Sequence, residues 1–250
     1  MLLLALVPYC VILLGLFLGY AGVRPAMLGW AICMLGALSG PTIGALVFWQ
    51  SQLWMLAGIA SLPFIVVAAK TIEDLSYPLI NDVTTDVAHP PVFAAAVDAP
   101  ANAGRDLAFP DRFGPIIRKS YPDLRPIVLD GSPPKVFRRA FDLVDERVGW
   151  DIKHSDEATG IIEAEVTTAV LSFVDDVVIR VKSAGDKTRV DMRSKSREGL
   201  VDGGCNAEQI RAFLNRLEGR KLDWSMDLNT GKEPPALKVH RGSHNQRDCN

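Results

Sequence analysis

Charged side chains are almost absent from the first 69 residues, where Arg24 is the only one. The other 181 residues carry all the remaining charges. This division predicts a membrane-embedded front part joined to a water-soluble domain. The predicted spans hold no ionisable residue, and ion or proton pathways across a bilayer normally need one. We therefore expect an anchor rather than a transporter or channel.

Cysteine is scarce as well. Cys10 and Cys33 fall in the apolar part, and Cys205 and Cys249 belong to no closely spaced metal motif. The chain also lacks a glycine-rich phosphate loop, a Gly-x-Ser-x-Gly turn and a His-Glu-x-x-His helix. We expect no cofactor, no metal and no assignable catalytic residue. A formal net charge of −2 also argues against a nucleic-acid partner.

Three apolar runs, at about 2–23, 25–49 and 53–69, predict membrane-crossing helices within an anchor of residues 1–70. Pro63 leaves a helical carbonyl without its partner, so we expect this helix to pack against the other two. Gly36, Gly40 and Gly44 recur every four positions, which permits close helix contact. The alternative is that membrane helices are simply rich in glycine.

The soluble domain begins with an extended, proline-rich part at residues 71–133. Extended pieces are plausible at Leu79–Thr84 and Ile127–Leu129, and Asp98–Asp111 is typical of a loop or insertion. An α+β core follows at 134–219. It opens with an amphipathic helix that begins at Pro133-Pro134 and ends at Gly149.

Four segments then alternate apolar and polar residues as strands do: Trp150–His154, Gly160–Thr168, Asp176–Ser183 and Thr188–Arg197. A second helix, capped by Asn206, continues to Leu217. The prediction is a two-layer α+β domain: a four-stranded antiparallel sheet with one dry face, covered by both helices. The polar residues 220–250 are predicted to be a disordered tail.

The outward face of this sheet is predicted to collect charges of both signs. One interpretation is a solvated face whose charges pair across the strands. The other is an anion- or partner-binding face, because residues 193–197 are locally basic and carry hydroxyls. Adjacent Asp175 and Asp176 should point to opposite faces, which disfavours chelation. The candidate binding residues are Asp82, Thr84, Thr85, Asp86, Arg180, Arg193, Ser196, Arg197, Asp202 and Asn206.

Several ordered segments resemble a bacterial family catalogued as domain of unknown function 1499. They include Ile80–Asp86 followed by Pro90-Pro91, Tyr121–Leu124, Gly149-Trp150, Ile162–Ala164, Phe173–Val181, Asp191–Arg197, and Asn206-Ala207 with Ile210-Arg211. The resemblance covers about Tyr77 to Leu217. Lys195 stands where the resemblance implies arginine, and Ala94–Asp106 is longer than usual.

The resemblance implies no activity, but it does imply a location. Members often resemble lipoproteins or membrane-anchored envelope proteins, so the soluble domain is expected on the periplasmic side of a multi-pass inner-membrane protein. The charges point the other way: Arg24 and Lys70 would share one side, and the positive-inside rule would make that side cytoplasmic. We expect the periplasm, with the lipid bilayer and another envelope or membrane protein as partners.

Two functions from different classes remain. One is a membrane-tethered binding or assembly module whose contact set is residues 193–197 with Asp82, Asp86 and Asp202. The other is a hydrolase-like enzyme of the membrane surface. It would use Asp82 or Asp86 as general base and Arg193 or Arg197 to hold an anionic group. A pocket joining the 84–86 loop to Arg197 would favour the enzyme, and a flat self-paired face would favour the module.

Overall fold

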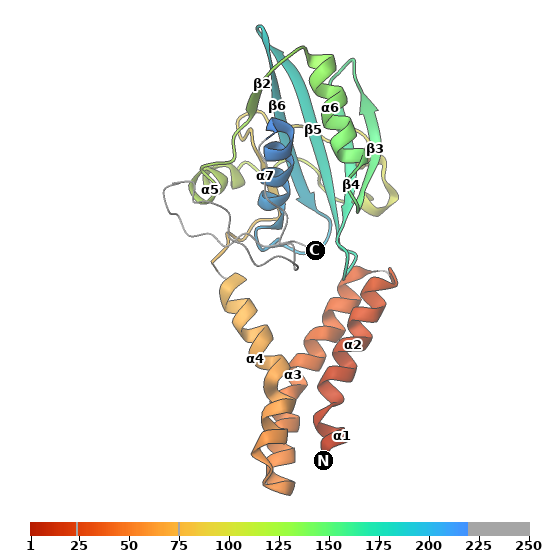
Figure 1. Cartoon of the computed structure of the whole chain (residues 1–250), viewed down its shortest axis with the longest axis vertical. Helices are drawn as coiled ribbons and strands as arrows, with labels where there is room; N and C mark the ends of the chain where they lie inside the picture. Colours follow the sequence, from red (N-terminus) through yellow and green to blue (C-terminus); the bar gives the residue numbers. More distant parts are fainter. Residues whose placement is uncertain (24, 75, 220–250) are drawn as a thin grey trace, which may run out of the picture.

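A computed structural model describes residues 1–23, 25–74 and 76–219, so the predicted tail at 220–250 lies outside the described residues. Its amino-terminal part contains α1 (Leu2–Ala5), α2 (Val7–Tyr20), α3 (Ala26–Ser51) and α4 (Trp54–Asp74), which extend away from the sheet domain (Figure 1). Three spans, Leu2–Tyr20, Ala26–Ser51 and Trp54–Ile72, are long and apolar enough to cross a membrane. The first span is divided at Leu6, just before Pro8 in the first turn of α2.

The glycine spacing in α3, expected from the sequence to permit close contact, produces close helix contacts. A Cβ on Gly36 would lie 2.9 Å from the carbonyl oxygen of Pro8 in α2, and one on Gly40 would lie 2.5 Å from that of Ala60 in α4. Both distances are too short for a side chain. The glycines thus let α3 contact α2 on one side and α4 on the other.

Pro63 is the other predicted contact point in the membrane part. Proline has no N–H, so the carbonyl of Ile59, one turn earlier, receives no helical hydrogen bond from residue 63. The hydroxyl of Tyr9 in α2 donates to this carbonyl oxygen at 2.7 Å. The packing expected from Pro63 is therefore present as a specific bond between α2 and α4.

The predicted four-stranded sheet is wrong, because the sheet has six strands. They are β1 (Asp82–Thr84), β2 (Ile127–Asp130), β3 (Trp150–Asp156), β4 (Ile161–Thr167), β5 (Val174–Ala184) and β6 (Lys187–Ser196). The order is β1-β6-β5-β4-β3, and β2 also pairs with β6; every pairing is antiparallel. Strand β6 is long enough to pair residues 193–195 with β1 and 187–190 with β2.

Helices α5 (Phe113–Ser120), α6 (Pro133–Asp145) and α7 (Cys205–Glu218) supply the layer against the apolar face of the sheet. Figure 1 shows α6 and α7 lying across β3 to β6. Both predicted helices cover this face, but the predicted number of two is wrong, because the short helix α5 adds a third. The main core joins Ile179 and Met192 of the sheet to Phe137 of α6 and Phe213 of α7.

The opposite face of the sheet is also covered, which corrects the expectation of one dry face and one solvated face. Residues 88–109, here called the covering segment, contain only two short 3-10 helices, η1 (Ala96–Asp98) and η2 (Pro100–Asn102). A second apolar cluster packs Phe93, Ala96 and Leu107 of this segment against Val178 of β5. The domain therefore has a third layer, and the charged strand residues lie beneath it.

Candidate functional site: a buried layer of paired charges

The centre of the charged face is an ion pair between Asp82 of β1 and Arg193 of β6. The guanidinium donates from Nε to Oδ1 at 2.9 Å and from Nη2 to Oδ2 at 2.8 Å, and Lys195 Nζ adds a third contact at 3.0 Å to Oδ2. Asp82 is fully buried and Arg193 is 1% exposed. The strand register brings these side chains together. Asp82 lies opposite Lys195, and Arg193 is two positions from Lys195 on the same face of β6.

Arg193 also holds the covering segment. Its Nη1 donates to the carbonyl oxygen of Pro91 at 3.1 Å and its Nη2 to that of Leu107 at 2.8 Å. The guanidinium carbon lies 4.7 Å from the ring centre of Phe93 and 5.5 Å from that of Phe109. The two ends of the segment are thus fixed to one cation, which has both hydrogen-bonding and aromatic partners.

Glu163 of β4 holds the middle of the same segment. Its carboxylate accepts hydrogen bonds from the backbone amides of Ala94, Ala95 and Ala96 at 2.6 to 3.1 Å. The residue is 1% exposed. A buried carboxylate that receives several amide donors satisfies backbone groups that the irregular segment leaves unpaired.

A second group of charges lies toward the end of the sheet nearest the membrane helices (Figure 1). Arg197 bonds the carboxylates of Asp176 and Glu165, with Nε 3.0 Å from Asp176 Oδ2. Asn102 of the covering segment donates to Asp176 at 3.0 Å, and Arg105 bonds both Asn102 and the carbonyl of Ser196. Here too the strand charges are used to fix the segment.

A third group lies at the other end of the layer. The carboxylate of Asp191 accepts from Arg180 and Arg189, and Asp86 bridges the same two guanidiniums at 3.2 and 2.6 Å. Burial raises the pKa of Asp86, but the amides of His89 and Ala88 and the two guanidiniums outweigh it and hold that pKa below its ordinary value. Asp86 is thus ionised, and both of its carboxylate oxygens accept hydrogen bonds.

Thr84 and Thr85 serve the pairing of strands. The Thr85 hydroxyl accepts from the amide of Met192 at 3.0 Å, and both hydroxyls lie within hydrogen-bond reach of the Met192 carbonyl oxygen. Both threonines are buried. These bonds between strands account for the polar residues that follow Asp82, and no ligand is needed to explain them.

Ser196, Asp202 and Asn206 lie apart from these charges, on the helix side of the sheet. The amide of Asn206 donates to Ser196 Oγ at 3.0 Å. The prediction that Asn206 caps the last helix is wrong: α7 begins at Cys205, and the Asp202 carboxylate accepts the backbone amides of Gly204 and Asn206. Burial raises the pKa of Asp202.

Asp175 lies on the same helix side of the sheet as Ser196, with which it hydrogen-bonds. It accepts a hydrogen bond from Gln209 at 2.7 Å, whereas Asp176 bonds Arg197 on the charged face. The prediction that the two aspartates point to opposite faces is confirmed. Burial raises the pKa of Asp175 to about 6, although hydrogen bonds from Ser196 and Gln209 oppose the rise.

The candidate residues therefore separate into distinct groups rather than one site. Asp82 pairs with Arg193, and Asp86 pairs with Arg180. Arg197 pairs with carboxylates that are not among the candidate residues. Five residues that complete the groups were not predicted from the sequence: Phe93, Asn102, Arg105, Phe109 and Gln209. The sequence signal for this arrangement was the mixture of acids and bases on alternate strand positions, which favours mutual pairing over a ligand.

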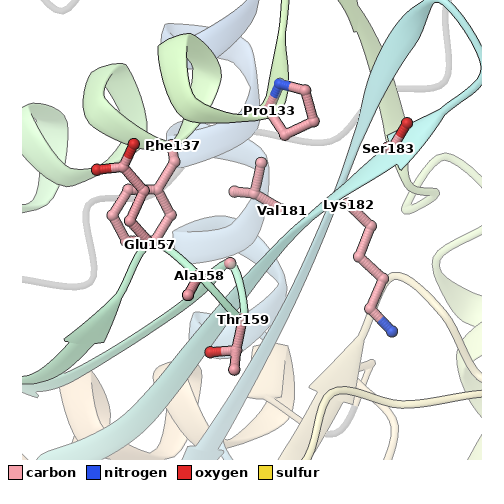
Figure 2. Close-up of a pocket in the computed structure, with 9 residues that line it drawn as sticks. Pro133, Phe137, Glu157, Ala158, Thr159, Val181, Lys182 and Ser183 are labelled. Atoms are coloured by element: carbon pink, nitrogen blue, oxygen red, sulfur yellow. The ribbon is translucent and has the colours of Figure 1, made fainter.

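A hollow among the described residues lies away from the candidate residues. This hollow, with a volume of about 210 Å³, lies between the start of α6, the β3–β4 turn and β5. Phe137, Glu157, Thr159 and Lys182 are among the residues that line it (Figure 2). None of the predicted site residues lines it. Within residues 1–23, 25–74 and 76–219, no group of three or more His, Cys, Asp or Glu side chains could hold a metal ion.

The comparison with known proteins agrees with the resemblance seen in the sequence. A family model described as "Protein of unknown function (DUF1499)" matches residues 82–217, which run from the first residue of β1 into the last turn of α7. The chain has no significant match among curated proteins or solved structures. The match spans more than half of the chain and the whole six-stranded sheet, and the chain therefore belongs to the DUF1499 family, whose function is unknown.

Proposed function

We propose that the chain is a membrane-anchored binding or assembly module of the cell envelope, and that its covering segment presents the contact surface. One observation carries this proposal: buried charges of the sheet hold residues 88–109 in place at several points. Arg193 holds both ends, Glu163 holds the middle, and Asp176 holds Asn102. A segment held at so many points is ordered before any partner arrives.

The length and the exposed composition of the segment support a contact role. Between Thr84 of β1 and Phe113 of α5 the structure has only two short 3-10 helices, and connections of this length are usually functional or disordered. The exposed residues of the segment include five alanines and two larger apolar side chains, Val92 at 75% and Val97 at 51% exposure, beside the polar His89, Asp98 and Asp106. A rigid, weakly charged loop of this kind suits a protein partner.

The same geometry does not favour the hydrolase-like alternative. A general base must reach a substrate proton within hydrogen-bond distance. Asp82 is fully buried against Arg193 and Lys195, and both carboxylate oxygens of Asp86 already hold partners. Arg193 is likewise saturated by carbonyls and a carboxylate. These groups stabilise the fold and leave no free acid, base or anion-holding group at the positions that the enzyme hypothesis needs.

A photoreactive side chain in living cells tests the module. p-Benzoylphenylalanine at Val92 or Val97 should give a discrete crosslinked protein in the membrane fraction. The matched control is Val128 of β2, which is 52% exposed but lies outside the covering segment. If both segment positions yield no protein product, or only the same products as Val128, the covering segment is not the contact surface.

The location is a separate part of the proposal: a multi-pass inner-membrane protein with its sheet domain in the periplasm. The resemblance to envelope proteins supports this side, against the weaker indication of Arg24 and Lys70. Alkaline phosphatase and a fluorescent protein that matures only in the cytoplasm, each fused after Asn250, report the side directly. Phosphatase activity without fluorescence is expected, and fluorescence without phosphatase activity would place the domain in the cytoplasm.

A further inference from the structure

We propose that the membrane-proximal edge of the sheet domain is itself a lipid-binding surface. This edge, here called the rim, consists of residues 77–79, 168–173 and 199–203. We infer that the rim enters the headgroup region of the bilayer that the anchor crosses. The sheet domain is then in direct contact with the membrane surface and is not held away from it by a flexible linker. The inference concerns lipid contact only and holds whichever side of the membrane the domain occupies.

The three segments of the rim are neighbours. The amide of Asp202 donates to the carbonyl oxygen of Ile80 at 3.1 Å, and the side-chain amide of Asn81 donates to that of Gly199 at 2.7 Å. The amide of Val174 donates to the carboxylate of Glu198 at 3.1 Å. Residues that are far apart in the sequence thus form one continuous edge at the end of β5 and β6.

The anchor places this edge at the membrane surface. The hydroxyl of Ser172 donates to the carbonyl oxygen of Gly19 at 2.8 Å, and Leu171 packs so closely there that a Cβ on Gly19 would lie 3.0 Å from it. Gly19 is the penultimate residue of α2, at the end of the first apolar span. Figure 1 shows the β4–β5 connection directly against the ends of α2 and α3.

The second tether is equally short. Helix α4 ends at Asp74, its apolar span reaches Ile72, and the rim begins only three residues later at Tyr77. Two spans therefore end next to the same edge of the domain. Because an apolar span ends where the hydrocarbon ends, the rim must lie at the depth of the lipid headgroups.

The chemistry of the rim fits that depth. Four of its large apolar side chains are exposed in the protein: Leu200 at 85%, Leu79 at 69%, Val170 at 44% and Val201 at 39%. Asp202 is the one charged residue of the rim. Its carboxylate is turned inward and accepts backbone amides at the start of α7. Apolar side chains without exposed charge are favoured at the boundary of headgroups and acyl chains, where a charged surface would be hydrated instead.

A lipid-crosslinking experiment with the full chain tests the inference. The purified protein is reconstituted into vesicles of phosphatidylethanolamine and phosphatidylglycerol with p-benzoylphenylalanine at Leu200 in one variant and at Val128 in another. Both positions are exposed and apolar, but Val128 lies on β2, which Figure 1 places far from the anchor. Irradiation followed by mass spectrometry should give lipid adducts at Leu200 at least tenfold above those at Val128.

Two results would overturn the inference. Equal, low lipid adducts at both positions would show that the rim stays in water. Adducts of the Leu200 variant with a second copy of the chain, in place of lipid, would show that the rim is a protein interface. The 85% exposure of Leu200 makes the substitution tolerable to the fold, and an unchanged melting temperature of both variants confirms that each is folded.

Discussion

Asp82 and Arg193 form a two-point ion pair in the interior of the domain, with N–O distances of 2.9 and 2.8 Å. The pair joins the short strand β1 to β6, and the same guanidinium bonds both ends of the covering segment. A residue pair that resembles catalytic machinery in the sequence thus acts as a structural clamp between the sheet and its third layer.

Removing one partner of this clamp should destabilise the protein strongly. Arg193→Met leaves Asp82 buried without its main partner, and breaking a buried ion pair typically costs about 3–5 kcal/mol. Lys153→Met is the matched control, because Lys153 pairs with Asp151 and Glu165 at a largely exposed position and should change the free energy of unfolding by less than about 1 kcal/mol. Denaturant unfolding of both variants measures the difference. Equal, small effects would contradict the clamp.

Glu163→Gln should loosen the covering segment without unfolding the sheet. The carboxylate receives the amides of Ala94, Ala95 and Ala96, whereas a carboxamide offers one oxygen and no charge. Hydrogen exchange followed by mass spectrometry should therefore show faster exchange in a peptide covering 94–96, with protection of β5 and β6 unchanged. Unaltered exchange in that peptide would mean that Glu163 does not hold the segment.

Much of the fold follows from the sequence because its signals are local. The spans are recognisable as long, continuous apolar runs, and β3 to β6 and the helices α6 and α7 each show a clear period of hydrophobicity. Strands β1 and β2 have only three and four residues, too few to establish a period, and they form because β6 offers them an unpaired edge.

The covering layer could not be predicted for a different reason. Charges at alternate positions of a strand are the same pattern whether they face water or a third layer. In this fold Phe93, Phe109 and Leu107, which lie in a proline-rich stretch without periodicity, decide between the two. The identities of the candidate residues were visible in the sequence, but their burial depended on a segment whose path no local pattern indicates.

The membrane part gives a prediction of its own. Tyr9→Phe removes the hydroxyl that bonds Ile59, and interhelical hydrogen bonds in membranes contribute about 0.6 kcal/mol on average. In a Pro63→Ala background the amide of residue 63 can bond Ile59 itself, so the effect of Tyr9→Phe should shrink toward zero. A double-mutant cycle of unfolding free energies in detergent measures this coupling. Equal effects of Tyr9→Phe in both backgrounds would show that Pro63 and Tyr9 are independent.

The buried carboxyl of Asp175 gives a pH prediction. Its pKa is raised to about 6 in the folded protein from 3.8, so folding favours its protonated form. That contribution is present below pH 4 and is lost as the pH rises to about 6; at about 1.4 kcal/mol per pKa unit, it amounts to about 3 kcal/mol. Asp175→Asn keeps the acceptor for Gln209 but cannot ionise. Relative to the parent, it should gain stability between pH 4 and pH 7, measured by denaturant unfolding. A constant difference across this range would refute the raised pKa.

The most direct test of the account is the exposure of Arg193 to water. The side-chain Nε–H of Arg193 is bonded to buried Asp82, while Arg138 offers a control with 74% of its side chain exposed. The full chain, labelled with 15N-arginine in detergent micelles and assigned by the loss of one signal in Arg193→Lys, allows both exchange rates to be measured by NMR. We predict that the Arg193 proton exchanges at least a hundredfold more slowly than that of Arg138. Equal rates would show that water reaches the charged layer, which would contradict its structural role as a sealed clamp and reopen the enzyme hypothesis.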